Sequence, residues 1–196
     1  MFESLPDIPR LFTALSEWGA ALVYVFVVAR SASSNSLNPN AAIPRWRLAA
    51  AAVGGLVVLV GAQELLGRAP LSLWVPGMMT AYALVWCVIR VGTALDWRWV
   101  THMSARAFIV AELAASLAWQ VIVYSHADKP YWHPLSFGGF TAISATCLAV
   151  VYFFERRVYR QGALPVLRYA DLASGVVIGI SIFALSNLSF ISTATP

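Results

Sequence analysis

The residues of this chain that could do chemistry are ionisable side chains inside long apolar runs, chiefly Glu17, Arg106 and Glu112. A charge at the centre of a membrane-spanning helix costs about 2.5–3.5 kcal/mol or more, so such residues are candidates for function by default. The apolar runs contain none of the patterns that catalysis would need, such as paired aspartates, a serine beside a buried histidine or metal-binding spacings. We therefore expect sensing or binding in this segment, with no catalytic residues.

Glu112 is the sharpest candidate because it lies in a repeating polar pattern. Polar side chains recur around it at multiples of four residues, namely Ser104, Glu112, Ser116 and Gln120. This spacing predicts a polar stripe on one helix face. The functional interpretation is a polar pocket or switch within a helix bundle. The structural alternative is an interhelical contact in which Glu112 is protonated or paired with one of three polar side chains, Arg106, Gln63 or Asn187.

Weaker candidates lie near the ends of the apolar runs. Glu64 closes the second run, where a carboxylate could meet water or a ligand. His126 and His133 stand seven residues apart across Pro130, which is not the same-helix spacing that makes a zinc motif specific. We predict no metal and no cofactor in this segment, and His102 lies too close to the end of a run to serve a haem at membrane depth.

Composition places these residues in a membrane. The chain is 60% hydrophobic and only 11% charged, whereas soluble domains are about 45–50% apolar and about 25% charged. Its formal net charge is +4, but the arginines flank apolar runs and do not cluster on an amphipathic element as phosphate binding would require. The sequence therefore predicts a protein whose solvent is the lipid bilayer and which does not bind nucleic acid.

Six apolar runs are long enough to cross the bilayer, for which about 20 residues suffice. They predict an all-α, polytopic membrane helix bundle, with residues 1–196 as one transmembrane domain and no soluble domain. The predicted spans cover about residues 11–29, 46–66, 71–91, 99–124, 135–154 and 171–190.

The basic residues between the spans predict an orientation, because the cytoplasmic side carries the excess of Lys and Arg in short loops. One face receives nine of them, Arg30, Arg45, Arg47, Arg90, Arg98, Arg156, Arg157, Arg160 and Arg168. The other face receives three, Arg10, Arg68 and Lys129. We therefore expect the amino terminus outside the cell and, after an even number of spans, the carboxyl terminus outside as well.

Two stretches carry a resemblance to a known family. The run ARAFIVAELAASLAWQVIVY at residues 105–124 and the closing FALSNLSFISTATP at residues 183–196 resemble the amino-terminal membrane sensor region of bacterial GHKL-type histidine kinases. They are similar to the accessory-gene-regulator type of receptor kinase. An acidic residue often precedes the tryptophan in that family, and here the position is Ala118.

The resemblance implies a sensor in the bacterial cytoplasmic membrane. Its signal would be a peptide or a small molecule, and the chain would form a homodimer by analogy. The kinase domain, with its ATP and Mg²⁺, would follow a further span beyond this chain. The hypothetical switch core comprises Glu112, Ser116, Trp119, Gln120 and Asn187, and the outer signal contacts would be Glu64, His126 and His133.

A small-solute transporter, or the membrane substrate-binding subunit of one, is the main alternative. Six spans suit such a protein. It would be expected to keep both termini in the cytoplasm, against the nine-to-three count of basic residues.

Overall fold

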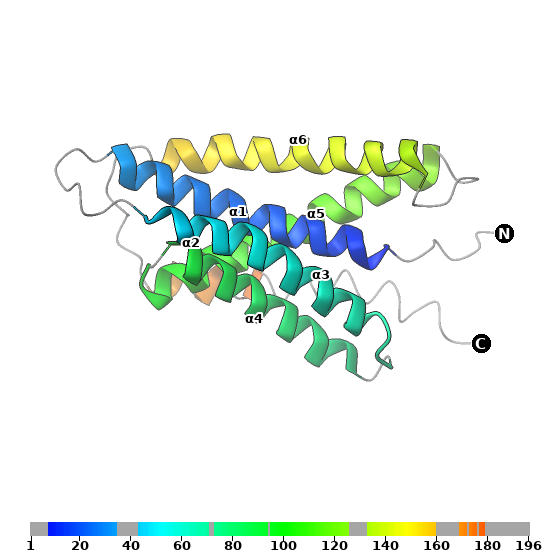
Figure 1. The fold of residues 1–196 in the computed structure, drawn as a ribbon, viewed down its shortest axis with the longest axis horizontal. Coiled ribbons are helices and arrows are strands. Elements are labelled where there is room, and N and C mark those ends of the chain that lie inside the picture. The colour runs from blue at the N-terminus through cyan, green and yellow to red at the C-terminus, as the bar shows by residue number, and fades with distance from the viewer. Residues whose placement is uncertain are drawn as a thin grey trace.

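The computed structural model describes residues 8–34, 43–70, 73–93, 95–125, 133–159, 169–171, 173–175 and 177–178. Throughout these residues the regular structure is helical, which confirms the predicted all-α bundle (Figure 1). The helices are α1 (Arg10–Ser34), α2 (Arg45–Ala49), η2 (Ala50–Gly54), α3 (Gly55–Leu66), α4 (Trp74–Thr93), α5 (Trp97–Ser125) and α6 (Pro134–Tyr159). Short helical stretches also occur within residues 169–178.

Five helical segments are long and apolar enough to cross a membrane, so this is a multi-pass membrane protein. They overlap the first five predicted spans. The sixth, predicted at residues 171–190, falls mostly outside the described residues. Two helices extend well beyond the predicted spans, since α1 continues to Ser34, past residue 29, and α6 continues to Tyr159, past residue 154. Glu155 therefore belongs to the helix and not to the linker after it.

The second span is one continuous rod made of α2, η2 and α3. Its middle, Ala50–Gly54, is π-helical, a form that loosens the regular backbone hydrogen bonding and is frequent at functional sites. The indole nitrogen of Trp18 on α1 donates a 2.7 Å hydrogen bond to the carbonyl oxygen of Ala52 in this segment. The π-helical turn is therefore tied to the neighbouring helix α1.

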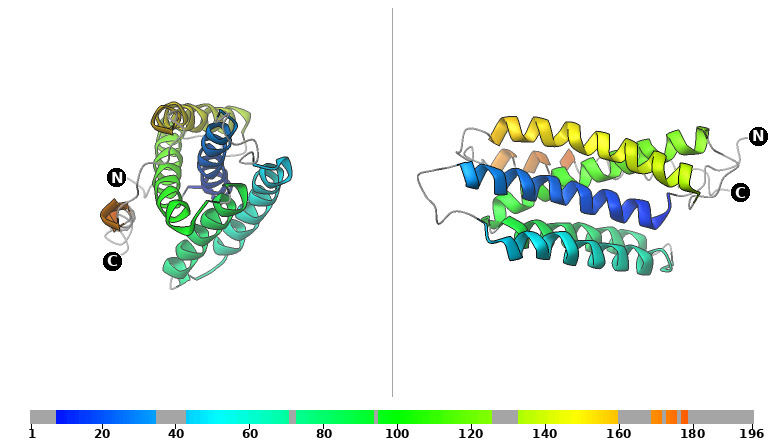
Figure 2. Two further views of the ribbon diagram at one scale, coloured as in Figure 1. Left: turned by 90° about the vertical axis from the view of Figure 1, so that its left-hand side faces the viewer. Right: turned by 45° about the horizontal axis from the view of Figure 1, so that its top comes forward.

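Helix α1 is the central element of the bundle. It packs against α3, α4, α5 and α6 and is the most deeply buried of the five spans, as the end-on view shows (Figure 2). Small side chains make this close packing possible, including Ala14, Ala20 and Ala21 on α1, all 0% exposed. Helix α6 packs chiefly on α1 and α5 and is the least buried span, so most of its surface faces lipid.

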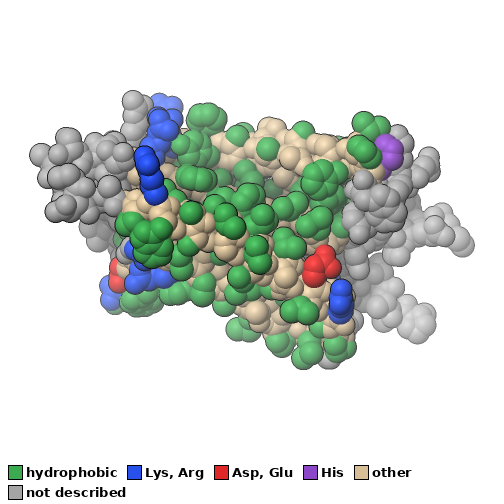
Figure 3. Space-filling view, in the orientation of Figure 1, with side chains coloured by type: hydrophobic (Ala, Val, Ile, Leu, Met, Phe, Trp, Pro, Cys, Tyr) green, Lys and Arg blue, Asp and Glu red, His purple; other side chains and the backbone are tan. Residues whose placement is uncertain are grey.

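The two ends of the bundle differ in charge. Because the helices alternate in direction, seven described arginines come to one end, namely Arg30, Arg45, Arg47, Arg90, Arg98, Arg156 and Arg157. We call it the arginine-rich end. Most basic side chains visible in the space-filling view gather there (Figure 3). Among the described residues, the opposite end carries Arg10, Arg68, Glu64 and His133, and we call it the Arg10 end.

Candidate functional site

The most deeply buried polar contact joins α1 to α3 toward the Arg10 end. Glu17 is 0% exposed and Gln63 is 1% exposed, and Nε2 of Gln63 donates a 2.8 Å hydrogen bond to Oε1 of Glu17. The other two oxygens of this pair, Oε2 of Glu17 and Oε1 of Gln63, have no hydrogen-bond partner among the described residues. A buried acceptor without a donor is costly, so this pair is only half satisfied.

Glu112 on α5 belongs to the same site. It lies within electrostatic reach of Glu17, and Arg10 acts on both carboxyl groups. Its Oε1 is also buried without a partner in the described part of the chain. We call Arg10, Glu17, Gln63 and Glu112 the Glu17 cluster. It draws on three helices, and its two carboxyl groups face a single cation.

Arg10 reaches this site from the first residue of α1. Its side chain lies along the end of α3, where a Cβ added at Gly67 would come within 2.9 Å of the Cγ of Arg10. Glycine therefore leaves room for the arginine stem. The guanidinium can in this way stay at the bundle end while it acts on carboxyl groups in the interior, a common arrangement for long basic side chains near membrane interfaces.

A second polar contact, nearer the arginine-rich end, joins α1, α5 and α6. Arg106 forms an ion pair with Oε1 of Glu155, and the hydroxyl of Tyr24 donates a 3.2 Å hydrogen bond to the same oxygen. Glu155 is 3% exposed and Tyr24 is 1% exposed, whereas the side chain of Arg106 is 40% exposed. We call these three residues the Glu155 cluster.

The Glu155 cluster is the part of the site that the sequence interpretation missed. Glu155 stands beside Arg156 and Arg157, one residue past the predicted span of residues 135–154. Arg106 was considered as a partner for Glu112, but it pairs with Glu155, and Gln63 pairs with Glu17. A signal was present, since Glu155 is the one acidic residue in the basic stretch of residues 155–160.

Both clusters lie on the interface between α1 and α5. Glu17 and Tyr24 are about two turns apart and so share a face of α1. Helix α5 runs antiparallel to α1 (Figure 1) and brings Glu112 within electrostatic reach of Glu17 and Arg106 within reach of Tyr24. The remainder of the buried face of α5 is mostly alanine, at positions 105, 107, 111, 114, 115 and 118. Small residues allow the two helices to approach closely. They also leave few large, interlocking side chains that would oppose a movement of α1 along α5.

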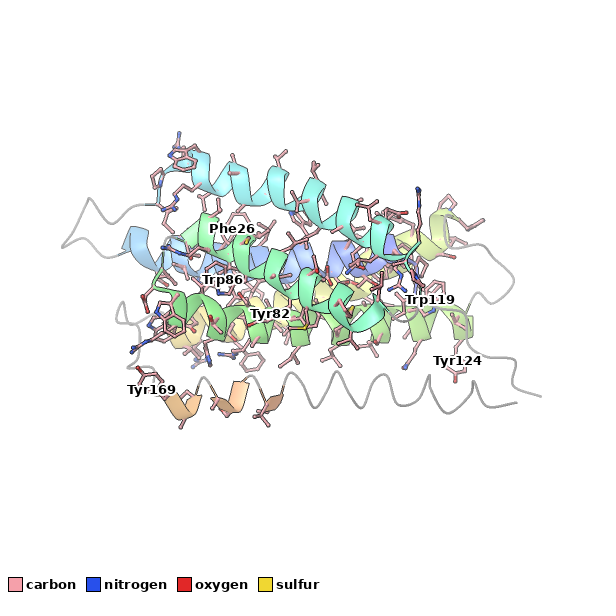
Figure 4. All side chains as sticks on the ribbon, turned by 90° about the horizontal axis from the view of Figure 1, so that it is seen from below. Phe26, Tyr82, Trp86, Trp119, Tyr124 and Tyr169 are labelled. Atoms are coloured by element: carbon pink, nitrogen blue, oxygen red, sulfur yellow. The ribbon has the colours of Figure 1, made fainter. Side chains whose placement is uncertain are left out.

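The predicted polar stripe does not come together as one pocket. Ser116 is half-buried and Gln120 is exposed, so of the residues in the stripe that were proposed for the switch core only Glu112 reaches the Glu17 cluster. Trp119 instead packs edge-on against Phe12, with ring centroids 6.0 Å apart, and Phe12 stacks on Phe140 at 3.9 Å. Trp119 thus belongs to an aromatic cluster toward the Arg10 end (Figure 4).

The weaker candidates are dispersed. Glu64 is exposed next to the buried Gln63. His133 is half-buried just before α6, where its Nδ1 accepts a 3.3 Å hydrogen bond from the backbone N–H of Leu135. His126 and Asn187 lie outside the described residues.

The start of the predicted sixth span lies beside α5. The guanidinium of Arg98 donates a 2.7 Å hydrogen bond to the hydroxyl of Tyr169 and lies 4.8 Å from the centre of its ring, at the end of the bundle opposite Tyr124 (Figure 4). Farther along, a Cβ at Gly175 would lie 3.8 Å from Nδ1 of His102. Residues 169–178 therefore run along the same helix that carries Glu112 and Arg106.

Chemically, the site offers buried carboxyl groups and one interhelical ion pair. Within the described residues, no group of three or more His, Cys, Asp or Glu side chains is placed to hold a metal ion. The chain matches no protein-family profile, no curated protein and no solved structure.

Proposed function

We propose that residues 1–196 form a membrane-embedded signal-sensing region, which relays an extracellular or membrane signal to a cytoplasmic histidine kinase domain. The observation that carries the proposal is the placement of both polar clusters on the α1–α5 interface. A signal that shifts α1 against α5 would disturb both clusters together. This link between the two halves of the membrane is the property that a relay requires.

The relay works through two packings of the same helices. A signal can shift the balance between two states only by as much as its affinity for them differs. Breaking the Glu17–Gln63 contact or the Tyr24–Glu155 hydrogen bond leaves buried polar groups unpaired, so intermediate positions of α1 are unfavourable. Two discrete arrangements with alternative partners are therefore favoured over continuous sliding.

The proposal places the arginine-rich end in the bacterial cytoplasm and the Arg10 end outside, following the asymmetry of basic residues. A peptide or small molecule would then meet the outer end, close to Glu64 and His133. The signal would pass inward through the Glu17 cluster and the Glu155 cluster. A homodimer, as in other kinases of the resembled type, would bring two kinase domains together.

Orientation tests the class of protein first. Phosphatase and fluorescent-protein reporters fused after Pro196 should show this point outside the cytoplasm, and a cysteine placed at Arg68 should react with a membrane-impermeant maleimide in intact cells. A cysteine at Arg45 should react only after the membrane is opened. A cytoplasmic Pro196 with a protected Arg68 would contradict the proposal and favour the small-solute transporter.

Signalling tests the switch itself. In the full-length protein, reconstituted in nanodiscs, Glu112→Gln should change the rate of autophosphorylation from ATP, because it removes one of the two carboxyl groups of the Glu17 cluster. Leu113→Ala is the matched control, since Leu113 is 65% exposed on the neighbouring position of α5. A reading frame that continues into one further span and a histidine-bearing helix is expected. Autophosphorylation that is the same in the wild type and in Glu112→Gln would refute the switch.

A further inference from the structure

The Glu17 cluster carries an imbalance of charge that the relay proposal leaves unexplained. Glu17 and Glu112 contribute two carboxyl groups, and within the described part of the chain Arg10 is the one cationic side chain that acts on both. If both carboxyl groups were ionised, the cluster would hold a net charge of −1 in the bundle interior. Net charge at this depth costs several kcal/mol, so a neutral cluster requires one further positive charge.

The hydrogen bonds of the cluster show the same shortfall. Oε2 of Glu17, Oε1 of Gln63 and Oε1 of Glu112 are all buried acceptors without a partner among the described residues. A protonated carboxyl group has an O–H that can donate a hydrogen bond, whereas an ionised one can only accept. One added proton therefore removes the excess negative charge and supplies a donor where acceptors predominate.

We propose that the Glu17 cluster binds one exchangeable proton, shared between the carboxyl groups of Glu17 and Glu112, and that this proton holds α1 against α3 and α5. A bound metal cation would meet the charge requirement equally well. Hard cations held by protein oxygens usually take about six or more ligands, and the cluster has three oxygens without a partner. A proton, which needs only one or two oxygens, fits this number better.

Among the residues that the structure describes, the other charged groups around the cluster do not supply the missing charge. On α3, Glu64 and Arg68 are exposed. His133, which precedes α6 at the same end, is half-buried and its Nδ1 is engaged with Leu135. The described charged residues of α4 and α6 lie toward the arginine-rich end, and they are Arg90, Glu155, Arg156 and Arg157.

Infrared spectroscopy of residues 1–196 in phosphatidylcholine nanodiscs tests the inference, because a protonated carboxyl group has a carbonyl band of its own. Charge balance predicts the number of protons in each variant. The wild type should hold one. Glu17→Gln and Glu112→Gln should each lose that band, because Arg10 then balances the single remaining carboxylate. Arg10→Gln should hold two protons and give a band about twice as strong.

Glu64→Gln is the matched control and should leave the band unchanged. At constant pH the band should be equally strong in sodium chloride and in choline chloride. Loss of the band when sodium is added would show that the cluster binds a metal cation and would overturn the proposal of a bound proton. A band that survives in both Glu17→Gln and Glu112→Gln would also overturn it. Should either glutamine variant fail to fold, the doubling in Arg10→Gln remains a decisive measurement. The inference does not depend on the kinase, so its failure would leave the orientation and autophosphorylation results unaffected.

Discussion

The hydroxyl of Tyr24 on α1 and the ion-paired Arg106 on α5 meet at the same oxygen, Oε1 of Glu155 on α6. One carboxylate oxygen thus receives donors from two other helices, although Tyr24 and Glu155 are 131 residues apart in the chain. A shared acceptor of this kind fixes the three helices relative to one another. It also makes the contact sensitive to the loss of either donor.

Replacing Arg106 by glutamine tests this contact. The change leaves Glu155, which is 3% exposed, without a positive partner. Because Arg106 itself is partly exposed, we expect a loss of about 2 kcal/mol, between the effects typical of exposed and of fully buried ion pairs. Thermal or denaturant unfolding in detergent micelles measures it. Arg157→Gln should have little effect, and the Arg106→Gln, Glu155→Gln double variant should recover part of the loss. No recovery in the double variant would indicate a different cause.

Replacing Gln63 by leucine should destabilise the bundle at its other polar contact. The substitution removes the donor to Oε1 of Glu17 and leaves a buried carboxyl group without its hydrogen bond. We expect a loss of about 1–3 kcal/mol, measured by the same unfolding assay. Glu64→Gln alters an exposed neighbour and should be silent. Equal stability of Gln63→Leu and Glu64→Gln would mean that the contact contributes nothing.

Replacing Phe12 by alanine should open a cavity in the aromatic cluster. Phe12 is 0% exposed and packs against Phe140 and Trp119, so its loss should cost about 3 kcal/mol. Phe26→Ala is the control on the same helix, because Phe26 is 46% exposed and faces outward. A similar loss of stability in both variants would show that the stack has no special importance. Tryptophan fluorescence should shift only in Phe12→Ala.

Replacing Gly92 by alanine should disturb the contact of α4 with α1. A Cβ at Gly92 would come within 2.7 Å and 2.8 Å of the two methyl groups of Val25, and within 3.1 Å of Ala51. Since a β-branched side chain has little freedom to turn away, we expect Gly92→Ala to lower the unfolding temperature. Gly61→Ala, where nothing lies within 4 Å of the added Cβ, should leave stability unchanged or raise it slightly. The opposite order would disprove the close approach.

The spans could be predicted from the sequence because hydropathy and length are local properties. The same holds for the ionisable residues Glu17, Arg106 and Glu112, which stand out against apolar neighbours. The predicted span ends before α6 does because residues 155–157 are all charged, and a hydropathy pattern assigns such a run to water. Burial against Tyr24 and Arg106 keeps this turn within the bundle.

The pairing of the polar residues could not be predicted. Spacing along α5 shows that Glu112, Ser116 and Gln120 share a face, but it does not show which neighbouring helix covers each turn. Helix α1 also covers the turn of Gln120, where Ala118 and Ile122 are buried with Phe12, but steps of four residues wind the stripe around α5 and leave Gln120 exposed. Likewise, Trp119 meets Phe12 only because α1 and α5 run antiparallel at this register.

The central position of α1 has a consequence for how the protein is made. The helix that contacts nearly all the others leaves the ribosome before them, and it enters the membrane carrying Glu17 before these neighbours are made. Gln63 is made with the next span, so the carboxyl group of Glu17 gains its hydrogen-bond donor early in biosynthesis. Tyr24 must wait for α6. Membrane insertion therefore allows the Glu17–Gln63 contact to form early, whereas the Tyr24–Glu155 contact can form only once α6 has been made.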